Sequence, residues 1–163
     1  MYKIPYIDLG LEYKNYQSEI NKAFSNVMKS GDYIDGLLVK KFEKEIANFL
    51  GVKHVLTLNS GTDALLFSLA ALGLKKNDEV ITVSNSYIAT VSAICHFGAK
   101  PVFVDVKSNQ NIDVDLIEKR ITKKTKMILP VHLGGRPCDM NKIRLIAKRH
   151  KLFVVEDAAQ AFG

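Results

Sequence analysis

The sequence lacks the features of a secreted or membrane-spanning protein. It has two cysteines, Cys95 and Cys138, and no CxxC pair, so at most one disulfide can form. No apolar run approaches the roughly 20 residues that cross a bilayer, and the N-terminus has no signal-peptide core. These absences favour a cytoplasmic protein without a membrane partner. Cys95 lies in an apolar stretch, which predicts a buried free thiol.

Several nucleotide and nucleophile motifs are also absent. The chain has no Walker loop, no GxGxxG fingerprint and no GxSxG elbow. Its net charge is +6, but the lysines and arginines are scattered and form no basic stripe with interleaved aromatic residues. We therefore expect solvated charged faces and no nucleic-acid partner, with a weaker attraction to phosphorylated substrates as the alternative.

The 163 residues, 47% hydrophobic and 25% charged, have the composition of one globular domain. Short β-branched runs, typical of buried parallel strands, alternate with longer amphipathic stretches from residue 54 onward. The expected strands are 54–58, 79–83, 101–105, 127–131 and 152–156. The expected helices between them are 63–72, 88–97, 114–121 and 140–150. This alternation predicts an α/β fold with a mostly parallel sheet and flanking helices.

Two further helices are predicted before the first strand, at residues 13–28 and 39–50, with a loop over 30–36 between them. The sequence stops directly after the fifth expected strand, where a doubly wound sheet normally continues into a covering helix. We therefore expect residues 1–163 to be an incomplete part of a larger domain.

The stretch 59–65 follows an expected strand and opens an expected helix. Gly61 allows a tight turn, and Ser60 and Thr62 supply hydroxyls beside the positive end of the helix dipole. A phosphate cradle and an ordinary helix N-cap both fit this pattern.

Glu156 and Asp157 end the fifth expected strand, where open α/β sheets bind their ligands. A ligand cation such as a protonated ring nitrogen would offset the cost of burying a carboxylate there. Gln160 lies three residues further on and could share a helical face with Asp157. The alternative is that Asp157 caps a following helix.

Two other turns carry candidate side chains. Tyr87 follows the second expected strand and could stack on a planar ring, although a plain aromatic at a helix start fits as well. A zinc site of His132, Cys138 and Asp139 is disfavoured because the spacing matches no metal pattern. Asp139 is the expected cap of the next helix.

Five of these stretches in order resemble the DegT/DnrJ/EryC1/StrS aminotransferases, which are fold-type-I pyridoxal-phosphate enzymes. The similarity covers the whole chain, and it rests on Ser-Gly-Thr-Asp-Ala-Leu at 60–65, Asp-Glu-Val-Ile at 78–81, Gly-Ala-Lys-Pro-Val-Phe-Val-Asp at 98–105, Pro-Val-His-Leu-Gly-Gly at 130–135 and Glu-Asp-Ala-Ala-Gln at 156–160. The resemblance implies that residues 1–163 are the N-terminal portion of the cofactor-binding large domain.

The resemblance also implies a cofactor, pyridoxal 5'-phosphate, and a role for each matching residue. Gly61 and Thr62 would hold the cofactor phosphate, and Tyr87 would stack on the pyridine ring. Asp157 would pair with the ring nitrogen, and Gln160 would reach the ring hydroxyl.

The activity that the resemblance implies is transfer of an amino group from a donor to a nucleotide-linked keto-sugar, for polysaccharide or glycan synthesis, by a homodimer. The lysine that forms the Schiff base has no counterpart in residues 1–163, so this chain alone is expected to be inactive. Two alternatives are a sugar dehydratase of the same family, in which histidine replaces the lysine, and an inactive cofactor-binding fragment.

Overall fold

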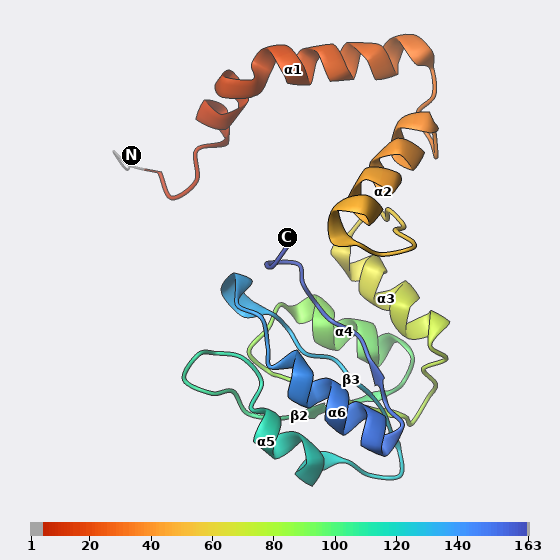
Figure 1. The fold of residues 1–163 in the computed structure, drawn as a ribbon, viewed down its shortest axis with the longest axis vertical. Helices are drawn as coiled ribbons and strands as arrows, with labels where there is room; N and C mark the ends of the chain where they lie inside the picture. Colours follow the sequence, from red (N-terminus) through yellow and green to blue (C-terminus); the bar gives the residue numbers. More distant parts are fainter. Residues whose placement is uncertain (1–4, 163) are drawn as a thin grey trace. The chain divides into compact units, whose positions relative to one another are not determined.

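The computed structural model describes residues 5–162, which divide between Thr57 and Leu58 into two compact units (Figure 1). The first unit holds helices α1 (Leu9–Ser30) and α2 (Leu37–Leu50). The Asp8 carboxylate accepts a 2.9 Å hydrogen bond from the Leu11 N–H and so caps α1. Gly31 and Gly51 end the two helices in the left-handed conformation, as the glycine at 51 predicts.

The second unit is a parallel sheet with flanking helices. Its strands are β1 (Glu79–Thr82), β2 (Lys100–Phe103), β3 (Thr125–Ile128) and β4 (Phe153–Val154), in the order β2-β1-β3-β4. Its helices are α3 (Gly61–Ala71), α4 (Ile88–His96), α5 (Val114–Ile117) and α6 (Met140–His150). Short 3-10 turns cover Glu118–Arg120 and Leu133–Gly135. The predicted α/β architecture is therefore present.

The strand order reverses between β1 and β3. From β1 the chain crosses through α4 to β2, and from β3 it crosses in the other direction through α6 to β4. Right-handed crossovers of opposite direction place α4 and α6 on opposite faces of the sheet, and Figure 1 shows these helices on either side of β3. The carboxyl ends of β1 and β3 consequently form the topological switch point where such sheets bind ligands.

The core lies between the sheet and its helices. Val80, Ile81, Met127 and Ile128 from the two central strands are fully buried, together with Ile94 of α4 and Ile143 of α6. Among the described residues no helix is both long and apolar enough to cross a membrane.

The expected strand at residues 54–58 is wrong, since this segment pairs with no strand of the sheet. A strand needs backbone partners on a neighbouring strand, and the Thr57 N–H instead donates to the Glu43 carboxylate at 2.8 Å. β-Branched composition alone therefore did not identify a sheet strand here.

The prediction that Cys95 is buried is also wrong. Ala93 and Ile94 are buried, but Cys95 falls on the exposed face of α4, and the buried thiol is Cys138. Burial on a helix follows its 3.6-residue period, so an apolar neighbourhood in sequence does not decide one position.

Candidate functional site

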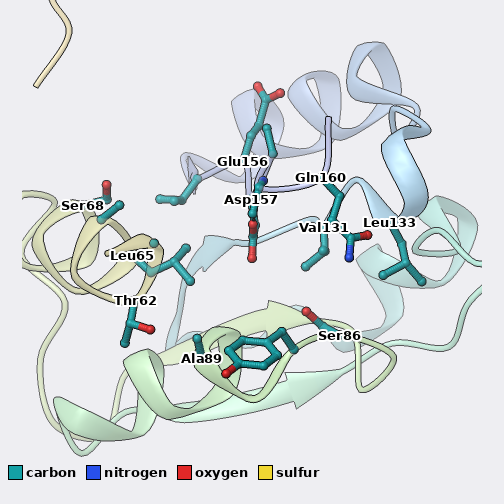
Figure 2. Close-up of a pocket in the computed structure, with 16 residues that line it drawn as sticks. Thr62, Leu65, Ser68, Ser86, Ala89, Val131, Leu133, Glu156, Asp157 and Gln160 are labelled. Carbon is teal, nitrogen blue, oxygen red and sulfur yellow. Dashed lines mark hydrogen bonds between the residues drawn. The ribbon is translucent and has the colours of Figure 1, made fainter. Parts of the chain in front are cut away.

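A cavity of about 450 Å³ opens at the carboxyl ends of β1, β3 and β4 (Figure 2). All five predicted site residues line it: Gly61, Thr62, Tyr87, Asp157 and Gln160. They come from three separate segments of the chain, which are the start of α3, the turn after β1 and the turn after β4. The two turns meet because parallel strands end at one edge of the sheet.

One wall of the cavity is the N-terminus of α3. Ser60 is the N-cap, and its hydroxyl oxygen accepts the Asp63 N–H at 3.1 Å. Within the described part of the chain, the N–H groups of Gly61 and Thr62 donate to no other residue. A Cβ added at Gly61 would meet nothing within 4 Å, so the space before the helix is open. The N-cap interpretation is confirmed, and the helix still presents free donors to an anion.

Asp157 is held at the opposite wall by both its backbone and its carboxylate. Its N–H donates to the Pro130 carbonyl and its carbonyl accepts the His132 N–H, each at 3.0 Å. Its Oδ1 accepts the Ala159 N–H at 3.2 Å, and its Oδ2 accepts the Thr90 hydroxyl at 3.0 Å. Among the described residues no basic side chain forms an ion pair with this carboxylate.

Glu156 and Asp157 point to different places (Figure 2). Glu156 is directed away from the cavity centre, whereas Asp157 is directed toward it. The two oxygens of Glu156 are occupied by Arg144 at 3.1 Å and by Nε2 of His132 at 3.2 Å. Of the two adjacent carboxylates, only Asp157 therefore faces a ligand in the cavity.

His132 is buried, and both of its ring nitrogens have partners. The Cys138 N–H donates to Nδ1 at 3.2 Å, so Nδ1 is an acceptor and Nε2 carries the proton donated to Glu156. This arrangement leaves no ring nitrogen free for the disfavoured zinc site. Asp139 caps α6 as predicted, accepting the Lys142 N–H at 3.1 Å.

Gln160 and Tyr87 complete the lining. The Gln160 Oε1 accepts the Gly134 N–H at 2.7 Å, which leaves its side-chain N–H₂ as the donor available to a ligand. Tyr87 precedes α4 and is 76% exposed, so its ring is an open surface at the cavity mouth.

The profile of the DegT/DnrJ/EryC1/StrS aminotransferase family matches residues 14–163. The chain belongs to the DegT/DnrJ/EryC1/StrS aminotransferase family. The resemblance stated from the sequence motifs is thereby confirmed.

Two curated members of this family illustrate the similarity. A dTDP-3-amino-3,6-dideoxy-alpha-D-galactopyranose transaminase of Aneurinibacillus thermoaerophilus is 45% identical over 161 residues, which is 98% of this chain and 44% of that protein. A 3-oxo-glucose-6-phosphate:glutamate aminotransferase of Bacillus subtilis is 41% identical over 163 residues, 99% of this chain and 37% of that protein. The chain thus spans less than half the length of these relatives.

Solved structures of aminotransferases have the same fold over the length of this chain. Streptomyces venezuelae DesV aligns with a TM-score of 0.96 at 41% identity, over 100% of this chain and 44% of that one. Bacillus subtilis NtdA with bound cofactor PMP aligns at 0.95 and 39% identity, over 100% of this chain and 38% of that one. This likeness confirms the predicted fold class, a partial α/β domain with a parallel sheet and flanking helices.

Two local predictions at the DegT-type site are wrong. No helix follows β4 among the described residues, so Asp157 is not a helix cap and Gln160 shares no helical face with it. The segment forms a turn, in which Asp157 bonds the N–H two residues on. This hydrogen bond is the one that defines an Asx turn, which aspartate commonly forms.

Thr90 and Ser86 are the residues that sequence reasoning missed. Thr90 is fully buried and touches the Asp157 carboxylate, and Ser86 bonds Thr90 at 2.8 Å. Ser86 lies two residues before α4 and Thr90 lies in its first turn, so no helical spacing in the sequence predicts their contact.

Proposed function

We propose that residues 1–163 form the N-terminal portion of the large domain of a pyridoxal-phosphate-dependent aminotransferase. The observation that carries the proposal is that one cavity has a site for an anion on one wall and a site for a cation on another. A helix N-terminus with free N–H donors suits an anion, and a carboxylate without a basic partner suits a cation. Pyridoxal phosphate carries both, as a phosphate and a protonated ring nitrogen.

The residues present fit this cofactor group by group. Gly61 and Thr62 would receive the phosphate, and Asp157 would hold the proton on the ring nitrogen. Gln160 would donate its side-chain N–H to the ring hydroxyl, and Tyr87 would cover the ring. When bound, the cofactor supplies an electron sink for breaking and forming bonds at the amino carbon.

The substrates follow from the family. Relatives are named as transaminases of dTDP-amino sugars, which supports a nucleotide-linked keto-sugar as the acceptor and a separate amino donor. No lysine lies among the cavity-lining residues of the described chain. We therefore assign the Schiff-base lysine to a segment outside these 163 residues, and we place the enzyme in the cytoplasm as a homodimer.

Binding of pyridoxamine 5'-phosphate tests the proposal, because this amine form of the cofactor needs no lysine. We expect Asp157→Asn to weaken binding at least tenfold, the loss typical of one charge-assisted bond. Asp139→Asn is the matched control, since it removes the same charge outside the cavity and asparagine still caps a helix. Equal affinity of the Asp157→Asn variant and the unchanged chain would contradict the proposed site.

Borohydride reduction after mixing with pyridoxal phosphate tests the assignment of the lysine. We expect only scattered labelling of surface lysines, read by peptide mass spectrometry. Stoichiometric labelling of one lysine of this chain, blocked by pyridoxamine 5'-phosphate, would show that the Schiff-base residue lies within residues 1–163.

A further inference from the structure

We propose that Thr90 and Ser86 are positioning residues that fix the carboxylate of Asp157 for its cationic ligand. The inference rests on the proposed function, since the ligand is the protonated ring nitrogen of the cofactor. It goes beyond that function because Thr90 does not line the cavity and acts only through Asp157.

The hydrogen bonds among the three side chains have one consistent direction. The carboxylate of Asp157 can only accept, so the 3.0 Å contact uses the single hydroxyl proton of Thr90. Thr90 must then accept at its 2.8 Å contact with Ser86, which makes Ser86 the donor. The chain of donation therefore runs from Ser86 through Thr90 to Asp157.

Thr90 is well placed for this role because it cannot move away. It lies on α4 with no exposed surface, between the buried residues Ala89, Ala93 and Ile94 of the same helix. Its β-branched side chain has few rotamers within a helix. A donor fixed in the core thus holds Asp157, which belongs to a turn 67 residues further along the chain.

The two oxygens of Asp157 are fixed from two different elements. Oδ1 is bonded within its own turn by the Ala159 N–H, and Oδ2 is bonded across the sheet by Thr90. A carboxylate has about four lone-pair sites, so these bonds orient its plane and leave acceptor sites for the cavity. Without Thr90, the side chain would rotate about a single remaining contact.

The test compares Thr90→Val with Thr82→Val. Both threonines are fully buried and both donate one hydroxyl hydrogen bond, but Thr82 donates to the Leu129 carbonyl at 2.8 Å and does not touch Asp157. Thr90→Ser keeps a hydroxyl and serves as the rescue variant. Ser86→Ala removes the first donor in the series of hydrogen bonds from Ser86 through Thr90 to Asp157.

The probe is pyridoxamine 5'-phosphate labelled with ¹⁵N in the ring, added to the 163-residue chain and its variants. Affinity is measured by cofactor fluorescence, and the ¹⁵N resonance reports whether the ring nitrogen is protonated. We expect Thr90→Val to weaken binding about tenfold and to move the resonance toward that of the unprotonated ring. Ser86→Ala should change both in the same direction by less, and Thr90→Ser and Thr82→Val should resemble the unchanged chain.

Three other results would each contradict a different part of the proposal. If Thr90→Val and the unchanged chain give the same affinity and resonance while Asp157→Asn loses both, the positioning role is refuted and the cofactor site stands. If Thr82→Val and Thr90→Val weaken binding equally, Thr90 contributes only to stability. If the unchanged chain is folded, as judged by circular dichroism, and binds no pyridoxamine 5'-phosphate, the proposed site fails, and this inference fails with it.

Discussion

The backbone N–H of Gly134 donates a 2.7 Å hydrogen bond to the side chain of Gln160, 26 residues further along the chain. The bond joins the glycine turn after β3 to the turn after β4, two walls of the same cavity. The geometry of each turn therefore affects the other.

Gly135 is the position at which this dependence can be tested. Its φ is +79°, and a Cβ there would lie 3.1 Å from the Gln160 carbonyl oxygen. Gly73 has a similar φ of +73°, but its Cβ would meet nothing within 4 Å. Alanine at either position costs roughly 1–2 kcal/mol of backbone strain, measured by denaturant unfolding. We expect only Gly135→Ala to weaken binding of pyridoxamine 5'-phosphate as well, and equal binding by both variants would contradict the coupling.

Tyr87 should contribute to ligand affinity without contributing to stability. Its ring is 76% exposed at the cavity mouth, and an aromatic contact is worth about 0.5–1.5 kcal/mol. We expect Tyr87→Ala to weaken pyridoxamine 5'-phosphate binding roughly three- to tenfold, with an unchanged melting temperature, and Tyr87→Phe to bind normally. Phe67→Ala removes another exposed aromatic outside the cavity and should leave binding intact.

Glu43 should make the stability of the first unit depend on pH. The Thr57 N–H and hydroxyl each donate to its Oε1 at 2.8 Å, and these bonds hold the pKa of Glu43 below its ordinary value of 4.5. A carboxyl with a lowered folded pKa adds stability above its unfolded pKa, and this stability is lost as the pH falls through the folded pKa.

We therefore expect Glu43→Gln to lower the melting temperature at neutral pH. The difference from the unchanged chain should shrink as the pH falls below 4.5 and vanish once the pH is below the lowered folded pKa of Glu43. Circular dichroism against temperature at several pH values measures this. Glu45→Gln is the control, because Glu45 is exposed and, within the part of the chain that the structure describes, its one ion pair is with Lys41 at 3.8 Å. A difference that persists in acid would rule out the carboxylate as its source.

The two thiols should react at very different rates. Cys95 is exposed, whereas Cys138 is buried and its Sγ lies 3.3 Å from the Val131 carbonyl oxygen. Burial raises the pKa of the Cys138 thiol above its ordinary value of 9.0, which keeps it protonated and unreactive at neutral pH. Iodoacetamide should label one site rapidly, and Cys95→Ser should abolish that fast phase in a mass-spectrometric time course. Fast labelling of Cys138 would show that the β3 turn opens readily.

Sequence patterns predicted the elements whose caps and apolar faces lie within one short stretch of the chain. Helix α6 was placed at its observed bounds because the Asp139 cap and its apolar face both lie within one short stretch. Residues 54–58 were misassigned because strand propensity records no partner. The resemblance located five cavity-lining residues, but Thr90 was missed because its contact with Asp157 spans 67 residues and leaves no periodic trace.

The ladder between β3 and β4 covers only two residue pairs, followed by a single bridge between Val131 and Asp157. The site carboxylate thus sits where the sheet has nearly ended, beside a central pair of strands with longer registers. Amide hydrogens of residues 155–160 should exchange with deuterium through small local openings, much faster than those of β1 and β3, which require the sheet itself to open. A ligand that binds Asp157 and Gln160 should slow this exchange, because binding reduces the local opening of residues 155–160.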